Sequence, residues 1–337
     1  MRQPGLFDWQ TRLEQLSEGG DPLVRLNAAV HWEQFGPVLA PVRDKERLSN
    51  AGRKPYDLIV MFKVLLLQTL YNLSYDQTEF QIRDRLSFMR FLGLSLGDAV
   101  PDANTIWLFR ETLTELGIIE ALFAQFDEYL RTHGFSAKKG QIVDASIVSV
   151  PIQRNNREEN EQIRDGQVPE DWNEPKRRQK DIDARWTKKN NTSYFGYKNH
   201  IQIDVKHKLI RDFDVSPASL HDSQVFEELL DEDNSSRDVY ADAAYRSAKI
   251  LAFLEAQGYR QHIQRKGYRN HPLPDSQVRG NRTRARIRAR VEHVFGGQGN
   301  RLKLLLIRTI GRVRAAAAIG LRNLAYNLMR YECLVRT

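Results

Sequence analysis

The second half of the chain alternates short runs of β-branched residues with segments whose apolar positions have helical spacing. Gln141–Val150 is rich in isoleucine and valine and predicts a strand, and apolar side chains alternate along one face from Tyr194 to Val205. Further strands are predicted at 208–215, 238–241 and 259–263, with helices at 221–230, 248–257, 283–295 and 313–331. This order indicates an α/β architecture, in which helices cover the faces of a sheet.

Residues 1–135 show the apolar spacing of helices instead. The predicted helices lie at 56–71, 75–91, 102–116 and 118–132. Ser74 and Gln77 have the spacing of a capping box, which opens the second of them. Several short helices joined by tight turns are typical of a DNA-binding helical domain, and equally of any small helical bundle.

A polar stretch from 151 to 191 interrupts the α/β half. It holds 10 basic and 9 acidic residues with few aliphatic ones, so we expect an exposed and partly ordered insertion. The predicted organisation is a helical domain over 1–135 and an α/β domain over 136–337 that contains the insertion. Three strands in sequence followed by alternation is the order expected of a ribonuclease-H-like fold.

Positive charge is concentrated in one segment. The formal net charge is +8, from 51 Lys and Arg against 43 Asp and Glu. Arg265–Arg314 alone holds 14 basic residues and only two acidic ones, Asp275 and Glu292, while the rest is neutral or slightly acidic. Such a block indicates a phosphate-binding surface, and the alternative is a solvated basic helix face.

Cysteine and apolar runs bear on the compartment. The one cysteine, Cys333, excludes a disulfide framework or a cysteine-based zinc site within one chain, and fits a reducing setting. The first residues lack the apolar core of a signal peptide, and the longest apolar run, Leu58–Leu70, contains Lys63 and Gln68. We therefore expect a buried helix rather than a membrane span there, and a cytoplasmic protein.

Three carboxylates occupy positions where a charge is costly unless it is used. Asp144 lies inside a hydrophobic strand, Asp242 follows a strand end, where open α/β sheets place ligand sites, and Glu292 is isolated among arginines. Carboxylates from separate elements could hold two divalent cations for chemistry at phosphorus. Simpler interpretations are a salt bridge for Asp144, a helix N-cap for Asp242 and an ion pair with Arg288 for Glu292.

Five segments together resemble the motif series of bacterial DDE transposases. They are Ile142–Val148 (IVDASIV), Tyr194–His200 (YFGYKNH), His221–Ser223 (HDS), Val239–Arg246 (VYADAAYR) and Arg288–Phe295 (RARVEHVF). Each motif alone is weak, but the five in this order are most similar to the insertion-sequence-five family. Pro101–Ile106 and Phe109-Arg110 also resemble that family's helical region, so the resemblance covers about residues 48–334.

The resemblance implies a ribonuclease-H-like catalytic core in which Asp144, Asp242 and Glu292 hold Mg²⁺, with Mn²⁺ as an alternative. Water would first cut the DNA at the transposon ends, and the freed 3′ hydroxyl would then attack target DNA. Related transposases carry a tyrosine, arginine, glutamate and lysine signature around the glutamate. Arg288 and Glu292 match it, the tyrosine and lysine positions are Ala285 and Gly299, and Arg301 or Lys303 is the candidate replacement for the lysine.

The implied partner is double-stranded DNA, both the inverted repeats and the target. Two ends must be joined in one event, so we expect a homodimer or a larger assembly, in the bacterial cytoplasm in association with the nucleoid. The helical domain would share DNA binding and dimerisation. The expected DNA contacts are Arg284, Arg286, Arg288, Arg290, Arg301, Lys303, Lys198 and His200. The last two alternate with the apolar face of a predicted strand, so they approach the phosphate or face solvent.

Two other functions stay open at this point. One is a catalytically silent DNA-binding protein derived from a transposase, which the presence of all three carboxylates argues against. The other is a ribonuclease-H-like nuclease that cuts without joining. His221 and Asp222 could act in catalysis or as an N-cap. Trp172 and Trp186 could stack on flipped bases, although anchoring the insertion on the core is the favoured interpretation.

Overall fold

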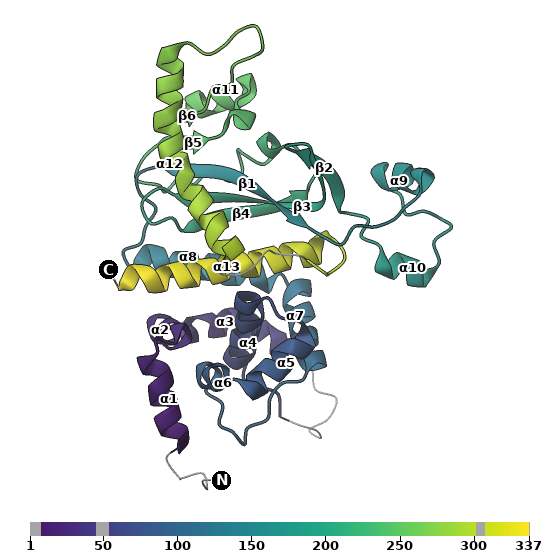
Figure 1. The fold of residues 1–337 in the computed structure, drawn as a ribbon, viewed down its shortest axis with the longest axis vertical. Coiled ribbons are helices and arrows are strands. Elements are labelled where there is room, and N and C mark those ends of the chain that lie inside the picture. Colours follow the sequence, from purple (N-terminus) through teal and green to yellow (C-terminus); the bar gives the residue numbers. More distant parts are fainter. Residues whose placement is uncertain (1–7, 45–53, 301–306, 337) are drawn as a thin grey trace. The chain divides into compact units, whose positions relative to one another are not determined.

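The computed structural model describes residues 8–44, 54–300 and 307–336, which form two compact units (Figure 1). The first unit comprises residues up to Phe126 together with those from Leu321 onward. The second unit runs from Asp127 to Gly320.

The end of the chain belongs to the first unit, which differs from the expectation of a single C-terminal domain. The second half of α13 (Arg312–Val335) has a buried apolar face. Its Tyr331 packs edge-on against Phe126, with ring centroids 5.8 Å apart, and its Glu332 pairs with Arg25 at 3.2 Å. The apolar spacing of a helix shows that it is buried but does not show which unit buries it.

The first unit is helical, as predicted. Its helices are α1 (Asp8–Glu18), α2 (Pro22–Ala29), α3 (Gly36–Leu39), α4 (Leu58–Tyr71), α5 (Tyr75–Asp84), α6 (Leu86–Leu92), α7 (Ala103–Glu115) and α8 (Ile118–Thr132), which continues into the second unit. The predicted capping box is confirmed, because the Gln77 amide N–H donates to Ser74 Oγ at 3.1 Å and the Ser74 N–H donates to Gln77 Oε1 at 3.0 Å. Arg85 has extended backbone and divides the single helix expected over 75–91 into α5 and α6.

The apolar run at the centre of the first unit is a buried helix, as expected. Phe62, Leu65 and Leu66 of α4 have no exposed surface. Among the described residues, no single helix is long and apolar enough to cross a membrane. α4 and α5 meet that condition only as a pair, which is bent by 103°.

The second unit is built on a six-stranded mixed sheet. Its strands are β1 (Gln141–Ser149), β2 (Arg185–Lys189), β3 (Thr192–Asp204), β4 (Ile210–Pro217), β5 (Asp238–Ala241) and β6 (Arg260–Ile263). β3 pairs antiparallel with β1, and β2 and β4 follow one another along its other edge. β5 and β6 then extend the sheet from β1 in parallel. This strand order confirms the expected ribonuclease-H-like α/β fold.

Helices cover both faces of this sheet, so its strands are buried on both sides. On one face, α11 (Ala248–Ala256) buries an apolar cluster that includes Val143 and Val239. Alternation along β1 turns Asp144 to the opposite face. There α12 (Asp275–Asn300) packs against β1 and β5, and runs across the sheet in Figure 1. The alternation along β1 therefore directs the Asp144 side chain toward α12.

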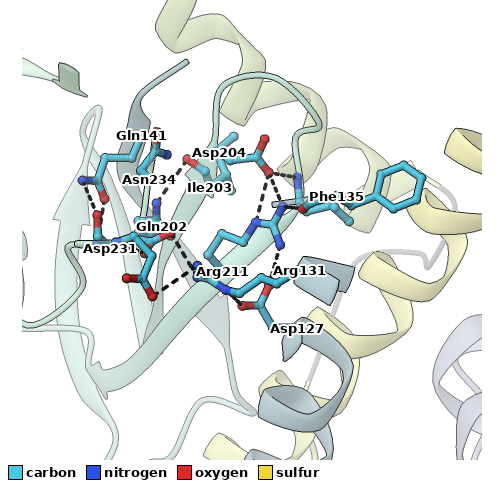
Figure 2. A network of polar contacts seen from close by, with 12 residues as sticks. Asp127, Arg131, Phe135, Gln141, Gln202, Ile203, Asp204, Arg211, Asp231 and Asn234 are labelled. Atoms are coloured by element: carbon cyan, nitrogen blue, oxygen red, sulfur yellow. Dashed lines mark hydrogen bonds and ion pairs between the residues drawn. The ribbon is translucent and has the colours of Figure 1, made fainter. Parts of the chain in front are cut away.

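A buried polar network holds the amino end of β1 and the turn that follows β3 (Figure 2). The Arg211 guanidinium, which has no exposed surface, donates to Asp204 at 3.1 Å, to Asp127 at 2.7 Å and to the carbonyl oxygen of Phe135. Arg131 joins Asp127 at 2.6 Å to Asp231 at 3.1 Å. Every carboxylate in this network has a cation beside it, so the buried charges are compensated.

Gly140 lets β1 enter the sheet next to β5. Its φ is +90°, a conformation that favours glycine. A Cβ there would lie 2.6 Å from the carbonyl oxygen of Asp238, a distance that no real contact tolerates. The close approach of the two strands that carry the aspartates therefore depends on this glycine.

Three segments differ from the sequence expectation. Residues 221–230 form only one 3-10 turn, η3 (Asp222–Gln224), because their apolar side chains reach the cluster under α11 through irregular turns instead of a helix. α12 begins directly after Pro274 and is twice as long as expected. The polar insertion, expected to be partly ordered, contains regular elements that were not predicted from the sequence: α9 (Arg157–Arg164), α10 (Glu174–Gln179) and β2.

Candidate active site

Asp144 lies inside β1 and Asp242 directly follows β5, and these two neighbouring strands run parallel. Ile142 of β1 pairs with Tyr240 of β5, and each aspartate lies two residues beyond this pair. The Ala145 N–H donates to Asp144 Oδ1 at 2.8 Å. Asp242 caps η4 (Ala243–Tyr245), a single 3-10 turn, by accepting from the Ala244 N–H at 2.8 Å. The sheet therefore brings the two aspartates to neighbouring positions on β1 and after β5. Asp242 also has the N-cap role that its sequence position predicts.

Arg288 of α12 connects Asp144 to Glu292. Its Nη1 donates to Asp144 Oδ2 at 2.6 Å, and its Nη2 donates to Glu292 Oε1 at 2.8 Å, one helical turn further on. Glu292 remains 61% exposed, whereas Asp144 is largely buried. The simpler interpretations of these two carboxylates, a salt bridge and an i,i+4 pair, are thus also present. These two ion pairs are compatible with a shared site, because the Arg288 guanidinium makes both contacts.

Asp144 is held in a form that favours a cation. Burial raises its pKa from 3.8 to about 6, against the opposing effect of Arg288, and the nearby charge of Asp242 raises it further. A desolvated carboxylate beside a second carboxylate lowers its free energy by gaining positive charge.

Tyr245 was not singled out from the sequence, yet its hydroxyl lies at this site. The side chain is fully buried in the apolar cluster under β1 and β5, and its hydroxyl has no hydrogen-bond partner. Burial and the charges of Asp144, Asp222 and Asp242 raise its pKa well above the ordinary value. The available signal was its place in the motif Val239–Arg246, three residues after Asp242.

The donor set fits a divalent cation of the Mg²⁺ type, which prefers carboxylate oxygens. Asp144 and Asp242 supply such oxygens at one edge of the sheet, and the buried, unpartnered Tyr245 hydroxyl shows that the polar groups there are not saturated. In the conformation described, Arg288 supplies the positive charge between Asp144 and Glu292. Among the described residues, no three His, Cys, Asp or Glu side chains converge closely enough to hold a metal ion.

The arginines expected to contact DNA are placed differently along α12. Arg286 is exposed, whereas Arg284 is half-buried and donates to Asn281 at 3.2 Å. Arg290 donates to the carbonyl oxygen of Val205 at 2.5 Å, so part of its donor capacity is used within the fold. Arg301 and Lys303, together with the lysine-equivalent position Gly299, lie outside the side chains that the structure describes.

Lys198 and His200 lie on the other face of the sheet from Asp144. Asp144 pairs with Ile201 in the register of β1 and β3, so the alternating neighbour His200 faces the opposite way. His200 is fully buried against Ser216, at 2.7 Å, and burial lowers its pKa to about 4. Lys198 is paired with Asp222 at 2.7 Å. This placement speaks against a direct DNA contact by either side chain in this conformation.

The two tryptophans of the insertion behave differently. Trp172 is buried, and its indole N–H donates to Glu159 of α9 at 2.7 Å, which agrees with the favoured anchoring role. Trp186 lies on β2, remains 46% exposed and packs beside Phe195 at 5.2 Å between ring centroids. Trp172 therefore anchors the insertion, and Trp186 stays partly exposed on β2.

Comparisons with known proteins give two family matches and one similar solved structure. Residues 136–328 match the family model described as a transposase DDE domain, and residues 11–112 match a second model described as a transposase domain (DUF772). A cryo-EM structure of the piggyBac transposase synaptic complex with hairpin DNA is similar over 94% of this chain and 75% of that chain, with 12% sequence identity and a TM-score of 0.49.

Proposed function

Because this chain belongs to the family of transposases with a DDE domain, we propose that it is a DNA transposase that cuts transposon inverted-repeat ends and joins the 3′ hydroxyl to target DNA. Its five motifs favour the insertion-sequence-five family within these enzymes. The observation that supports the proposal is that Arg288 pairs with both Asp144 and Glu292, while the charge of Asp242 acts on Asp144, so three elements distant in the chain contribute carboxylates to one region.

Asp144, Asp242 and Glu292 would hold Mg²⁺, with Mn²⁺ as the alternative. Such a cation, when bound, activates the attacking oxygen and stabilises the leaving oxygen at phosphorus. The chain's own part is to keep Asp144 desolvated and close to Asp242. Arg288 balances Asp144 and Glu292 electrically, and Tyr245 closes the apolar floor beneath the aspartates. The cytoplasm, where Mg²⁺ and DNA are both present, remains the proposed compartment.

Double-stranded DNA is the proposed substrate, bound as transposon ends and as target. The exposed and half-buried arginines of α12 lie one or two turns from Glu292, so they can hold backbone phosphates beside the carboxylates. The helical first unit would contribute end binding and dimerisation. A homodimer or larger assembly follows from the need to join two ends in one event.

An Asp144→Asn variant tests the catalytic assignment. With DNA carrying the element's own ends and Mg²⁺, we expect the variant to lose both cleavage and strand transfer while it retains end binding. Asp238→Asn is the matched control, because Asp238 begins the same β5 that Asp242 follows and pairs with Arg260 at 2.9 Å. Mg²⁺-dependent nicking by Asp144→Asn at the wild-type rate would contradict the proposal.

Joining is tested separately from cutting. A pre-cleaved end with a free 3′ hydroxyl should become covalently linked to target DNA in the presence of the wild-type protein. Cleavage without any joined product would replace the transposase by a nuclease of the same fold. Binding of ends with neither reaction would identify a DNA-binding protein that has lost catalysis.

A further inference from the structure

Three arginines meet beside the candidate active site. Arg246 follows η4, Arg265 follows β6, and Arg284 lies on α12, one turn before Arg288. β6 pairs with β5 up to Ile263 and Ala241, so Arg265 and Arg246 emerge at the sheet edge that carries Asp242. Arg284 precedes Arg288 by four residues, which is about 6 Å along a helix.

Asn281 fixes two members of this arginine cluster, which we define as Arg246, Arg265 and Arg284. Its amide bonds both ways with the backbone of Arg265, at 3.0 Å to the N–H and 2.8 Å to the carbonyl oxygen. The Asn281 Oδ1 also accepts from Arg284 Nη1 at 3.2 Å. Arg284 folds back over Gly280, where an added Cβ would lie 3.2 Å from its Nη1. Asn281 therefore fixes the backbone of Arg265 and the side chain of Arg284, while Arg246 Nη1 donates to Gln261 Oε1 at 3.3 Å.

Positive charge in the arginine cluster is not compensated. Among the described residues, none of its three guanidinium groups has a carboxylate partner, in contrast to Arg288, Arg131 and Arg260. Arg265 Nε is buried without a hydrogen-bond partner. Burial, and then the charges of Arg265 and Arg284, lower the pKa of Arg246. Holding three like charges together raises the free energy of the chain unless an anion joins them.

We propose that the arginine cluster binds a backbone phosphate of the DNA strand that enters the active site. Guanidinium groups match phosphate oxygens in geometry and form charge-assisted hydrogen bonds with them. Exposed basic residues continue the surface on the loop and helix next to the cluster: Lys266, Arg269, Arg279 and Arg282. A surface that extends over several basic side chains suits a polyanion better than a free phosphate ion. The inference rests on the proposed function, since it names a subsite for the same substrate.

Salt dependence of DNA binding tests the cluster directly. A fluorescein-labelled DNA duplex of arbitrary sequence is titrated with Arg246→Ala, Arg265→Ala and wild-type protein at several salt concentrations, and anisotropy gives Kd. Each variant should bind about tenfold more weakly and lower the slope of log K against log salt by about one. Arg237→Ala is the matched control, because Arg237 is an exposed arginine at the opposite end of β5. Wild-type slopes in both cluster variants would overturn the proposal.

Stability without DNA separates binding from folding. Because the arginines repel one another, Arg246→Ala and Arg265→Ala should keep or raise the melting temperature, and a lower one would show that these side chains serve the fold. Inorganic phosphate at constant ionic strength is the second arm. It should displace the duplex only weakly from the wild-type protein, and tight competition that both variants abolish would overturn the DNA assignment in favour of a free anion.

Cleavage assays distinguish this inference from the proposed function. If the wild-type protein cuts its ends while both cluster variants keep wild-type salt slopes, the phosphate subsite is wrong and the transposase assignment stands. If the variants reduce the slope of log K against log salt but the wild-type protein neither cuts nor joins DNA, the phosphate subsite is supported and the catalytic assignment is wrong.

Discussion

Arg211 and Arg288 each hold two carboxylates in the second unit, but their surroundings differ. The Arg211 side chain has no exposed surface, and each of its donor nitrogens reaches an acceptor on Asp204, Asp127 or Phe135. Arg288 is 22% exposed, and its Nε is buried without a hydrogen-bond partner. The first arrangement is complete within the chain, whereas the second leaves donor capacity unused.

The carboxylates show the same contrast. Asp204 accepts from the N–H groups of His207, at 2.6 Å, and Leu209, at 3.3 Å, in addition to Arg211. Asp144 has one backbone donor and one guanidinium, and it retains a pKa of about 6 because burial outweighs them. Buried charges that are fully compensated serve the fold, while incomplete compensation is the state expected of a site that awaits a ligand.

The largest expected effect comes from breaking the complete arrangement. Arg211→Ala leaves Asp204 and Asp127 without their shared cation and should lower the free energy of unfolding by about 3–5 kcal/mol. Urea denaturation measures this change. Arg260→Ala is the control, since Arg260 is 69% exposed in its pair with Asp238 and should cost at most about 1 kcal/mol. Equal losses in the two variants would remove the contrast between the regions.

Asp144→Asn should raise the free energy of unfolding, whereas Arg211→Ala should lower it. The folded-state pKa of Asp144 lies above its ordinary 3.8, so the folded protein binds the proton more tightly and loses stability as pH rises from about 4 through 6. Asparagine cannot ionise, so this fall should disappear. The net shift of about two pKa units already includes the effect of Arg288 and corresponds to about 3 kcal/mol, so we expect a gain of at most about 3 kcal/mol above pH 7.

Asp238→Asn is the matched variant for this pH dependence. Burial alone would raise the pKa of Asp238, but hydrogen bonds from Ser236, His262 and Arg260 lower it below the ordinary value. Its contribution to stability is therefore present above the unfolded-state pKa and is lost as pH falls. The free energy of unfolding is measured by denaturation between pH 3 and 8. Compared with the wild-type protein, Asp144→Asn should remove a loss of stability toward high pH, and Asp238→Asn should remove a loss of stability toward low pH. If both variants changed this pH dependence in the same direction, ionised Asp144 would not destabilise the folded protein.

Arg288→Ala tests whether the guanidinium occupies the place of a cation. Without it, Asp144 and Glu292 lose their shared positive charge, so Mg²⁺ should raise the melting temperature at roughly tenfold lower concentration than in the wild-type protein. Arg286→Ala, an exposed neighbour on the same helix, should respond to Mg²⁺ as the wild-type protein does. An unchanged Mg²⁺ response in Arg288→Ala would show that the ion pairs and the metal do not compete.

Local patterns were enough to place Asp144 and Asp242. A carboxylate inside a β-branched run and another at a strand end are visible without tertiary information, and the pairing of β1 with β5 brings their strands side by side. The same reasoning failed for Lys198 and His200. Alternation on β3 suggested a polar face, but β3 is an inner strand whose two faces are both covered, so its polar side chains are buried in pairs.

Contacts between distant elements were beyond sequence reasoning. Arg246 and Arg265 stand at ordinary loop positions, and only the pairing of β5 with β6 and the position of Asn281 unite them with Arg284. Tyr245 is similar, since its unpartnered hydroxyl is a result of burial that no spacing encodes. The bridging role of Arg288 lies between these cases. Its pair with Glu292 follows from helical periodicity, but its contact with Asp144 depends on how α12 crosses the sheet.

Glu292→Gln should change stability least and so isolates function most cleanly. Its exposed i,i+4 pair with Arg288 is worth about 0.3–0.5 kcal/mol, within the range of such surface pairs. Glu161→Gln breaks a comparable pair with Arg157 on α9 and should have the same small effect on unfolding. Cleavage of transposon ends should fall sharply in Glu292→Gln and remain unchanged in Glu161→Gln. If both variants cut normally, Glu292 belongs with the structural ion pairs, and the site is reduced to the two aspartates.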